Sequence, residues 1–185
     1  MNNYIFLLTL FVASVWCKES CENQHFDFAL TSGYIWKNDK HFKQVYGSGI
    51  PDIITADACY YPCRYGGLGI KTSYWHASGK TTFLKCKTTL QEVPLIFYLR
   101  GKVGCHLQAY ASLGGGAIFV NEKSYLGKVK NTVGIGEAEI GLNYSACNRF
   151  YITTAFRYLF PKTTVNKERH DIGGYGLRAG IGFSF

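Results

Sequence analysis

The sequence predicts an all-β protein, an eight-stranded antiparallel up-and-down β-barrel that crosses a membrane. The chain is 16% aromatic, contains 21 glycines and is only 17% charged, which is a composition rich in strand formers. Its mean hydropathy is −0.04, as expected where apolar and polar residues alternate and cancel along each strand. Beyond the N-terminal region, no stretch reaches the roughly 18 unbroken apolar residues of a membrane helix. Alternation is clearest in the last fourteen residues.

In this last stretch, residues 172–185, the odd positions form an apolar face and the even positions a small one. The odd positions from 175 onward are Tyr175, Leu177, Ala179, Ile181, Phe183 and Phe185. The even positions from 174 onward are glycines, Arg178 and Ser184. Successive side chains of a strand point to opposite faces, so the apolar face suits lipid and the small face suits a crowded lumen.

The chain ends on Gly-Ile-Gly-Phe-Ser-Phe, with Phe183 and Phe185 as its last aromatic residues. This ending resembles the terminal signal by which bacterial outer-membrane barrels are handed to their insertion machinery. The resemblance implies an outer-membrane localisation and the barrel-insertion machinery as a partner.

The N-terminus is consistent with export. Residues 4–16 form an apolar run that Cys17 and the charged pair Lys18 and Glu19 follow. The run is too short for a spanning helix and has the length of a secretory signal. We expect a signal peptide at residues 1–17 and a barrel domain at 18–185. Lipidation at Cys17 is the alternative, although Trp16 is too large for the usual lipoprotein pattern.

The first four strands are predicted at residues 26–36, 53–61, 67–76 and 89–99. Each alternates, and its apolar set is expected to face lipid: Phe26, Phe28, Leu30, Tyr34 and Trp36, then Ile54, Ala56, Ala58 and Tyr60, then Leu68, Ile70 and Tyr74, then Val93, Leu95, Phe97 and Leu99. Pro94 removes a ladder donor from the fourth strand, so we expect a β-bulge there.

The last four strands are predicted at residues 105–120, 133–145, 149–160 and 172–185. Outward positions in the fifth to seventh are Leu107, Ala109, Ala111, Leu113 and Phe119, then Ala138, Ile140, Leu142 and Tyr144, then Phe150, Ile152, Phe156, Tyr158 and Phe160. Lengths of about ten residues match tilted membrane strands.

The predicted connections alternate in length. Residues 61–64, 100–104 and 146–148 are tight turns, whereas 37–52, 77–88, 121–131 and 161–171 are long loops. Short periplasmic turns and long outer loops are typical of outer-membrane barrels, with both termini on the periplasmic side. The pattern resembles the small barrels of the OmpA-transmembrane, OmpX and OmpW kind. A soluble lipocalin-type barrel is the alternative, and the glycine rows argue against its inward apolar face.

Charged residues on the inward faces predict an ion-pair network that fills the lumen. They are Asp27, Asp57, Lys71, Glu92, Glu137, Glu139, Arg157 and Arg178. Glu137 and Glu139 are also compatible with an acid–base or metal site. Buried charges must be paired, and arginine forks pair carboxylates well, so we favour the structural interpretation, in which Arg157 and Arg178 pair with Glu137 and Glu139. Eight strands leave little room for a pore once these side chains point inward.

Two motifs of the sequence are candidates for catalysis or phosphate binding. Ser73, His76 and Ser78 lie close together at the outer end of the third strand, but nothing in the sequence supplies an oxyanion hole or an orienting group. Residues 114–116 are three glycines that precede a strand and not a helix, so they are no phosphate loop. We therefore expect a non-enzymatic protein without a cofactor or metal. A lipid-modifying enzyme or a narrow channel for small solutes remains the alternative.

Six cysteines remain after signal cleavage. Cys21, Cys59, Cys63, Cys105 and Cys147 are predicted at the periplasmic rim, and Cys86 in an outer loop. The periplasm is oxidising, so the five are candidates for disulfides, with a connectivity that the sequence does not define. Small apolar packing residues are the other interpretation. The number of cysteines is unusual for an outer-membrane barrel. It resembles the use of cysteine-rich envelope proteins by chlamydia-like bacteria.

The four long loops hold twelve Lys and Arg residues, Lys37 among them, against five acids, Asp52 among them, a balance of +7 within a chain of +8. The candidate anion-binding lysines are Lys80, Lys85, Lys87, Lys123, Lys128 and Lys130. We expect them to hold the phosphates of neighbouring lipopolysaccharide, with adhesion to an acidic host glycan as the alternative. Nucleic acid is not an expected partner at an outer surface.

Overall fold

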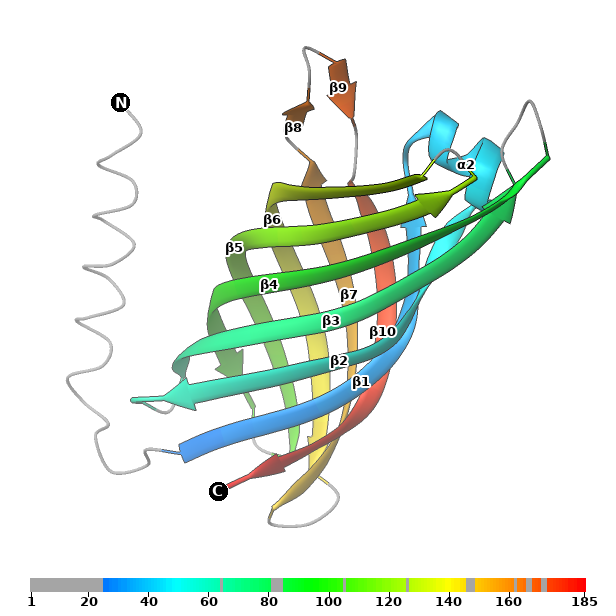
Figure 1. Ribbon diagram of the computed structural model, residues 1–185. Helices are drawn as coiled ribbons and strands as arrows, with labels where there is room; N and C mark the ends of the chain where they lie inside the picture. Colours follow the sequence, from blue (N-terminus) through cyan, green and yellow to red (C-terminus); the bar gives the residue numbers. More distant parts are fainter. Residues whose placement is uncertain are drawn as a thin grey trace.

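A computed structural model describes residues 25–63, 65–80, 85–104, 106–125, 127–145, 149–161, 163–165, 168–170 and 173–185; between residues 161 and 172 only the backbone is described. Eight strands form a closed antiparallel barrel in the order β1-β10-β7-β6-β5-β4-β3-β2 (Figure 1). The predicted fold class is therefore confirmed. No helix in the described ranges is long and apolar enough to cross a membrane. The predicted signal peptide, residues 1–17, lies outside these ranges.

All eight predicted strands are present. The barrel strands are β1 (His25–Lys37), β2 (Gly49–Tyr61), β3 (Gly66–Lys80), β4 (Lys87–Val103), β5 (Leu107–Ser124), β6 (Gly127–Ser145), β7 (Phe150–Pro161) and β10 (Gly174–Ser184). The barrel closes through β1 and β10, which pair from Asp27 opposite Ser184 to Lys37 opposite Gly174. The C-terminus and the start of β1 lie at the same end, where the tight turns connect the strands (Figure 1). By the usual arrangement of such barrels, this end is periplasmic.

The outer end departs from the prediction. β5 and β6 pair as far as Ser124 opposite Gly127, and β3 and β4 pair as far as Lys80 opposite Lys87. Residues 77–80 and 87–88 of one expected loop, and residues 121–124 and 127–131 of the other, are therefore strand. The alternation of apolar residues stops where a strand leaves the lipid, but backbone pairing continues into water. The strands predicted from alternation are therefore too short at this end. Four strands, β3 to β6, consequently extend as a wall beyond the others.

Two further elements lie in the outer connections. The short helix α2 (Lys40–Tyr46) lies between β1 and β2, and the strands β8 (Thr163–Val165) and β9 (Glu168–His170) form a small hairpin between β7 and β10. Gly79 of β3 allows the backbone of α2 to come close, because a side chain there would overlap the Val45 carbonyl group. The helix therefore rests directly on the wall.

The pairing shows two register shifts. One lies between Thr31 and Gly33 in the β1–β2 pair, and the other between Asp52 and Ile54 in the β2–β3 pair. The bulge expected at Pro94 is wrong, since β4 keeps one register with both β3 and β5. Pro94 removes one donor from the ladder without adding a residue, so the register has no reason to shift.

The barrel exterior is apolar. Thirty large apolar side chains of the described residues are exposed, among them Phe97, Leu113, Ile140 and Ile181, each more than 60% exposed. The charged side chains at the same level of the barrel point inward and are buried. A surface of this kind is stable only in lipid, and a closed antiparallel barrel is the β-structure that crosses a bilayer, in outer membranes. The protein is thus an outer-membrane barrel.

The glycines of the inner face receive tyrosine rings. Tyr98 of β4 covers Gly69 of β3, and Tyr151 of β7 covers Gly182 of β10. A methyl group at either glycine would overlap the ring of its tyrosine. The glycine rows therefore exist because aromatic side chains from neighbouring strands fill the lumen above them.

Candidate functional site

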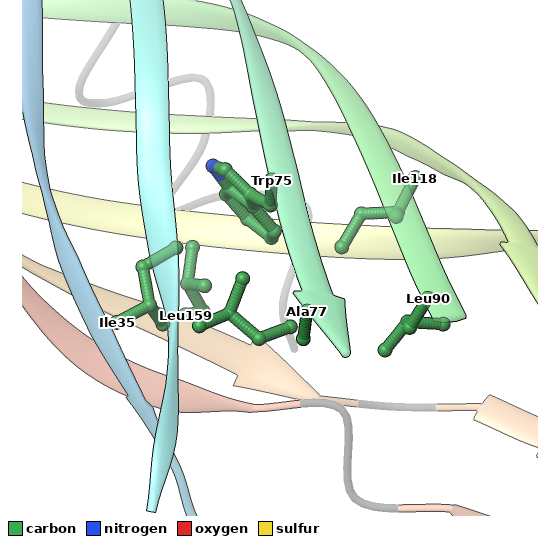
Figure 2. Close-up of a cluster of buried hydrophobic side chains, with 7 residues drawn as sticks. Ile35, Trp75, Ala77, Leu90, Ile118 and Leu159 are labelled. Carbon is green, nitrogen blue, oxygen red and sulfur yellow. The ribbon is translucent and has the colours of Figure 1, made fainter. Parts of the chain in front are cut away.

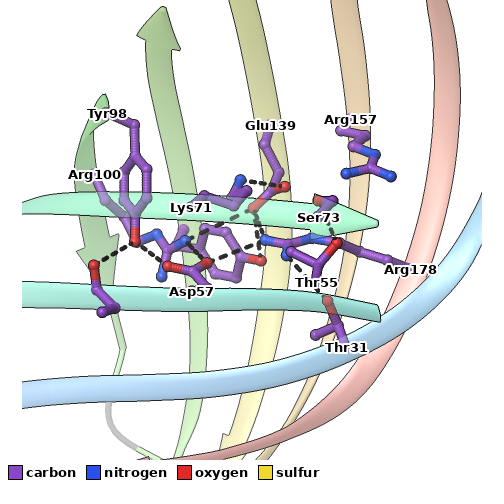
Figure 3. A network of polar contacts seen from close by, with 12 residues as sticks. Thr31, Thr55, Asp57, Lys71, Ser73, Tyr98, Arg100, Glu139, Arg157 and Arg178 are labelled. Atoms are coloured by element: carbon purple, nitrogen blue, oxygen red, sulfur yellow. Dashed lines mark hydrogen bonds and ion pairs between the residues drawn. The ribbon is translucent and has the colours of Figure 1, made fainter. Parts of the chain in front are cut away.

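The centre of the lumen holds a network of charged side chains (Figure 3). Arg178 Nη2 lies 2.6 Å from Glu139 Oε1 and 3.2 Å from Asp57 Oδ2, and so joins β10 to β6 and β2. Lys71 Nζ lies 2.5 Å from Glu137 Oε1 and 2.9 Å from Glu139 Oε2. These contacts cross the lumen between strands that are not neighbours, so the network ties opposite walls together.

Arg100 completes this layer. Its Nη2 lies 2.6 Å from Asp57 Oδ2, and its guanidinium is 4.7 Å from the Tyr98 ring and 4.5 Å from the Tyr110 ring. Tyr98 donates its hydroxyl to Asp57, and Tyr110 donates to Glu139 Oε1 at 3.1 Å. The layer is a packed sandwich of rings and ions that fills the lumen.

Arg157 has a different partner from the one expected. It points inward, but it pairs with Asp52 of β2 at 2.5 Å and not with Glu137 or Glu139. Asp52 also accepts hydrogen bonds from Thr55 at 2.8 and 3.0 Å, and both members of the ion pair are fully buried. Alternation predicts Asp52 outside the lumen, and the register shift next to it turns its side chain inward.

Two more pairs lie toward the ends. At the outer end Lys37 Nζ binds Glu92 Oε2 at 2.8 Å and lies 5.1 Å from the Trp75 ring. At the periplasmic end Lys102 Nζ lies 3.4 Å from Asp27 Oδ2. Sequence analysis missed Lys37, Asp52, Arg100 and Lys102. The signal for Arg100 and Lys102 was present, since they continue the inward register of Tyr98.

The lumen is electrically balanced. The buried side chains of the described residues include six carboxylates and six cations. They are Asp27, Asp52, Asp57, Glu92, Glu137 and Glu139, with Lys37, Lys71, Lys102, Arg100, Arg157 and Arg178. A balanced set lets each buried charge lie beside an opposite one, so the network joins the walls of the lumen.

A cluster of buried apolar side chains lies toward the outer end of the lumen, where Trp75 is opposite Glu92 in the strand register (Figure 2). Its buried members are Ile35, Ile50, Trp75, Ala77, Leu90, Ile118 and Leu159. Phe42 and Tyr46 of α2 pack against the cluster from outside. Tyr46 donates to Glu122 Oε1 at 2.6 Å and shares a hydrogen bond with Thr88 Oγ1 at 3.1 Å. Burial and the adjacent Glu122 carboxylate raise the pKa of Tyr46 well above its usual value. The helix therefore covers the outer mouth.

The three residues considered for catalysis, Ser73, His76 and Ser78, do not lie on one face of the barrel. Ser73 is inside the lumen, where it shares a hydrogen bond with Thr55, whereas His76 and Ser78 lie on the outer face. Ser78 Oγ and His76 Nε2 are 3.5 Å apart. Within the described ranges, no three His, Cys, Asp or Glu side chains gather as a metal site.

The outward face of the wall is polar and basic. We use the name polar wall for the outward-facing polar residues of β3 to β6, which contain no carboxylate: His76, Ser78, Lys80, Lys87, Thr89, Gln91, Asn121, Lys123, Lys128 and Lys130. The strand register aligns them in rows. One row is His76, Gln91, Asn121 and Lys130, and the next is Ser78, Thr89, Lys123 and Lys128.

The lysines of the polar wall repel one another. Lys80 lies directly opposite Lys87, and Lys123 directly opposite Lys128. Like charges in opposed positions destabilise a sheet. Eight lysines of the outer end are exposed, while no carboxylate described there is fully exposed: Lys40, Lys43, Lys80, Lys85, Lys87, Lys123, Lys128 and Lys130. Lys123, Lys128 and Lys130 were predicted in a loop but lie on strands β5 and β6. Lys37 and Asp52 were also predicted in a loop, but their side chains are buried in the lumen.

The cysteines and the C-terminus complete the predicted residues. Cys59 is buried with a free thiol, and the Cys63 thiol is 3.6 Å from the Gly66 carbonyl oxygen. The disulfides expected at this rim stay a prediction. Cys21, Cys105 and Cys147 lie outside the described residues. Phe185 exchanges backbone hydrogen bonds with Phe26 at 2.9 and 3.3 Å, and its ring contacts Phe183.

Comparison with known proteins identifies the fold. No protein-family model and no curated protein matches the sequence. Among solved structures, the chain is similar to Ail, the attachment invasion locus protein of Yersinia pestis, crystallised with the heparin analogue sucrose octasulfate (TM-score 0.56, 11% identity, 88% of this chain and 97% of that chain). It is also similar to Neisserial surface protein A (TM-score 0.55, 12% identity, 88% and 97%) and to the N-terminal barrel domain of Pseudomonas aeruginosa OprF (TM-score 0.54, 13% identity, 88% and 98%). The chain therefore has the fold of the small eight-stranded outer-membrane barrels.

Proposed function

We propose that this protein is a non-enzymatic barrel that binds anionic molecules of the cell surface through its polar wall. The proposal depends on two positions where lysines lie directly opposite each other on neighbouring strands: Lys80 with Lys87, and Lys123 with Lys128. Such pairs cost stability, and a bound anion offsets that cost. The balanced lumen then serves to hold the strands that display the wall.

The direction of the wall favours phosphates of neighbouring lipopolysaccharide as the anion. The wall residues share the outward face with the lipid-facing band, and Val93 and Phe119 lie one rung below Gln91 and Asn121. Lysines on that face project sideways over the lipid headgroups. Attraction between exposed lysines and phosphate is screened over about 8 Å at physiological salt, so contact has to be close.

An acidic host glycan is the second candidate. Ail, which shares the fold, was crystallised with a sulfated heparin analogue. The exposed lysines of α2, Lys40 and Lys43, extend the basic surface toward the outside, where a soluble polymer would approach. This candidate makes the top of the barrel, and not its side, the binding surface.

Charge-reversal variants test the proposal. The refolded barrel is titrated with lipopolysaccharide and with heparin at several salt concentrations. The variant Lys123→Glu/Lys128→Glu is compared with Lys40→Glu/Lys43→Glu, which changes the net charge equally on α2. We expect the wall variant to bind lipopolysaccharide at least about 10-fold more weakly at low salt, and the helix variant to bind it nearly normally. Equal loss in both variants would show that only net charge matters.

A further inference from the structure

A row of neutral polar side chains crosses the wall just above the lipid band. His76 of β3 lies opposite Gln91 of β4, and Gln91 lies opposite Asn121 of β5. Asn121 Nδ2 donates to Gln91 Oε1 at 3.1 Å, which links the two amides. We use the name amide row for these three residues. The rung below it is apolar, with Val93 and Phe119, so the amide row marks the height of the membrane surface.

Two hydrogen-bonding atoms of the amide row lack a partner. The His76 Nδ1 and Asn121 Oδ1 atoms are shielded from solvent and have no hydrogen-bond partner among the described residues. An unsatisfied polar group of this kind destabilises the folded protein. His76 and Asn121 are only partly buried on the outer face, so a rotation of either side chain brings its unsatisfied atom to a ligand that supplies the missing partner. Asn121 Oδ1 is an acceptor, so it needs a donor.

The need for a donor at Asn121 Oδ1 distinguishes a ligand that has only ester oxygens from one that also has hydroxyl groups. A fully ionised phosphate ester or a sulfate ester offers only acceptor oxygens and cannot satisfy Asn121 Oδ1. A sugar hydroxyl both donates and accepts, and therefore suits an amide beside an imidazole. Cations lie next to the row, because Lys130 is opposite Asn121 and Lys123 is opposite Thr89 on the rung above.

We infer that the amide row selects a saccharide that carries phosphate, namely the headgroup of an outer-leaflet glycolipid. The inference rests on the proposed function: the lysines hold the phosphate, and Gln91 and Asn121 bind hydroxyls of the sugar. The source is a lipid because the row faces sideways, directly above Val93 and Phe119, where the headgroup of an adjacent lipid stands.

The test compares ligands with and without a sugar. The refolded barrel in detergent micelles is titrated with fluorescently labelled lipopolysaccharide, with phosphatidic acid, which is anionic but has no sugar, and with a soluble heparin fragment. The pH is kept high enough for the phosphate of phosphatidic acid to be fully ionised, so that it carries no donor. The variant Gln91→Leu/Asn121→Leu removes the amides at similar volume. Thr154→Leu, an exposed residue on β7, is the control. The shift of the folded band on boiling verifies folding of each variant.

We expect the amide variant to bind lipopolysaccharide about 10-fold more weakly, as loss of two hydrogen bonds implies, and to bind phosphatidic acid normally. An equal loss for both lipids, or no loss for either, overturns the inference. A loss for the heparin fragment alone would make the ligand a soluble glycan and overturn the lipid source. The proposed function fails separately, if the wild-type protein binds none of the three ligands or if Lys123→Glu/Lys128→Glu binds them as tightly.

Discussion

The lumen and the polar wall use charge in opposite ways. In the lumen six cations face six carboxylates, all buried, at distances down to 2.5 Å. On the wall five lysines are exposed on one face with no carboxylate among them. Buried charges must be neutralised by partners, whereas exposed like charges persist at a modest cost in water. The comparison suggests that the lumen is built for stability and that the wall gives up some stability for binding.

The largest expected effect comes from the isolated lumen pair. Arg157→Met leaves the Asp52 carboxylate buried without its cation, so we expect the free energy of unfolding to fall by about 3 kcal/mol or more. The double variant Arg157→Met/Asp52→Asn removes both charges and should recover a large part of that loss. Urea unfolding of the barrel in lipid vesicles measures both. If the double variant were no more stable than the single one, charge pairing would not be the role of this contact.

The second effect concerns the glycines under the tyrosine rings. Gly182→Ala forces the Tyr151 ring to move, which should cost roughly 1–3 kcal/mol, the range for overpacked cores. Gly134→Ala on β6 is the matched control, because no atom lies within 4 Å of the added methyl group. The same unfolding assay compares the two. Similar stability of both variants would show that Tyr151 does not need the glycine.

The sequence predicted the membrane part of this fold and missed its outer part for a physical reason. In lipid, an apolar outward face and a small or charged inward face make the strands visible, as at Tyr175 to Phe185. Above the lipid, residues such as Ser78 and Lys123 are polar on both sides of the chain, so strand and loop look alike. Asp52 was missed because a register shift, which alternation does not reveal, turns it inward.

The third prediction has the opposite sign from the first. Lys123→Thr removes one partner of an opposed lysine pair, so the barrel should become more stable by up to about 0.5 kcal/mol. Binding of lipopolysaccharide should become weaker in the same variant. Unfolding and titration of one preparation give both values. Lower stability together with unchanged binding would contradict the view that the wall is kept for a ligand.

The smallest effect concerns the helix over the outer mouth. Burial and Glu122 hold the pKa of Tyr46 above its ordinary value of 10.0, so the folded protein retains the phenol proton longer than the unfolded chain. The contribution of this group to stability is therefore complete below pH 10 and declines as the pH rises beyond it. Because Tyr46 is only partly buried, solvent screens its interaction with Glu122 and the decline should be slight. Unfolding between pH 8 and pH 11 measures it, with Tyr46→Phe as the variant that cannot ionise. We expect the stability of the wild-type protein relative to Tyr46→Phe to fall slightly across this interval; a constant difference would place the ionising group elsewhere.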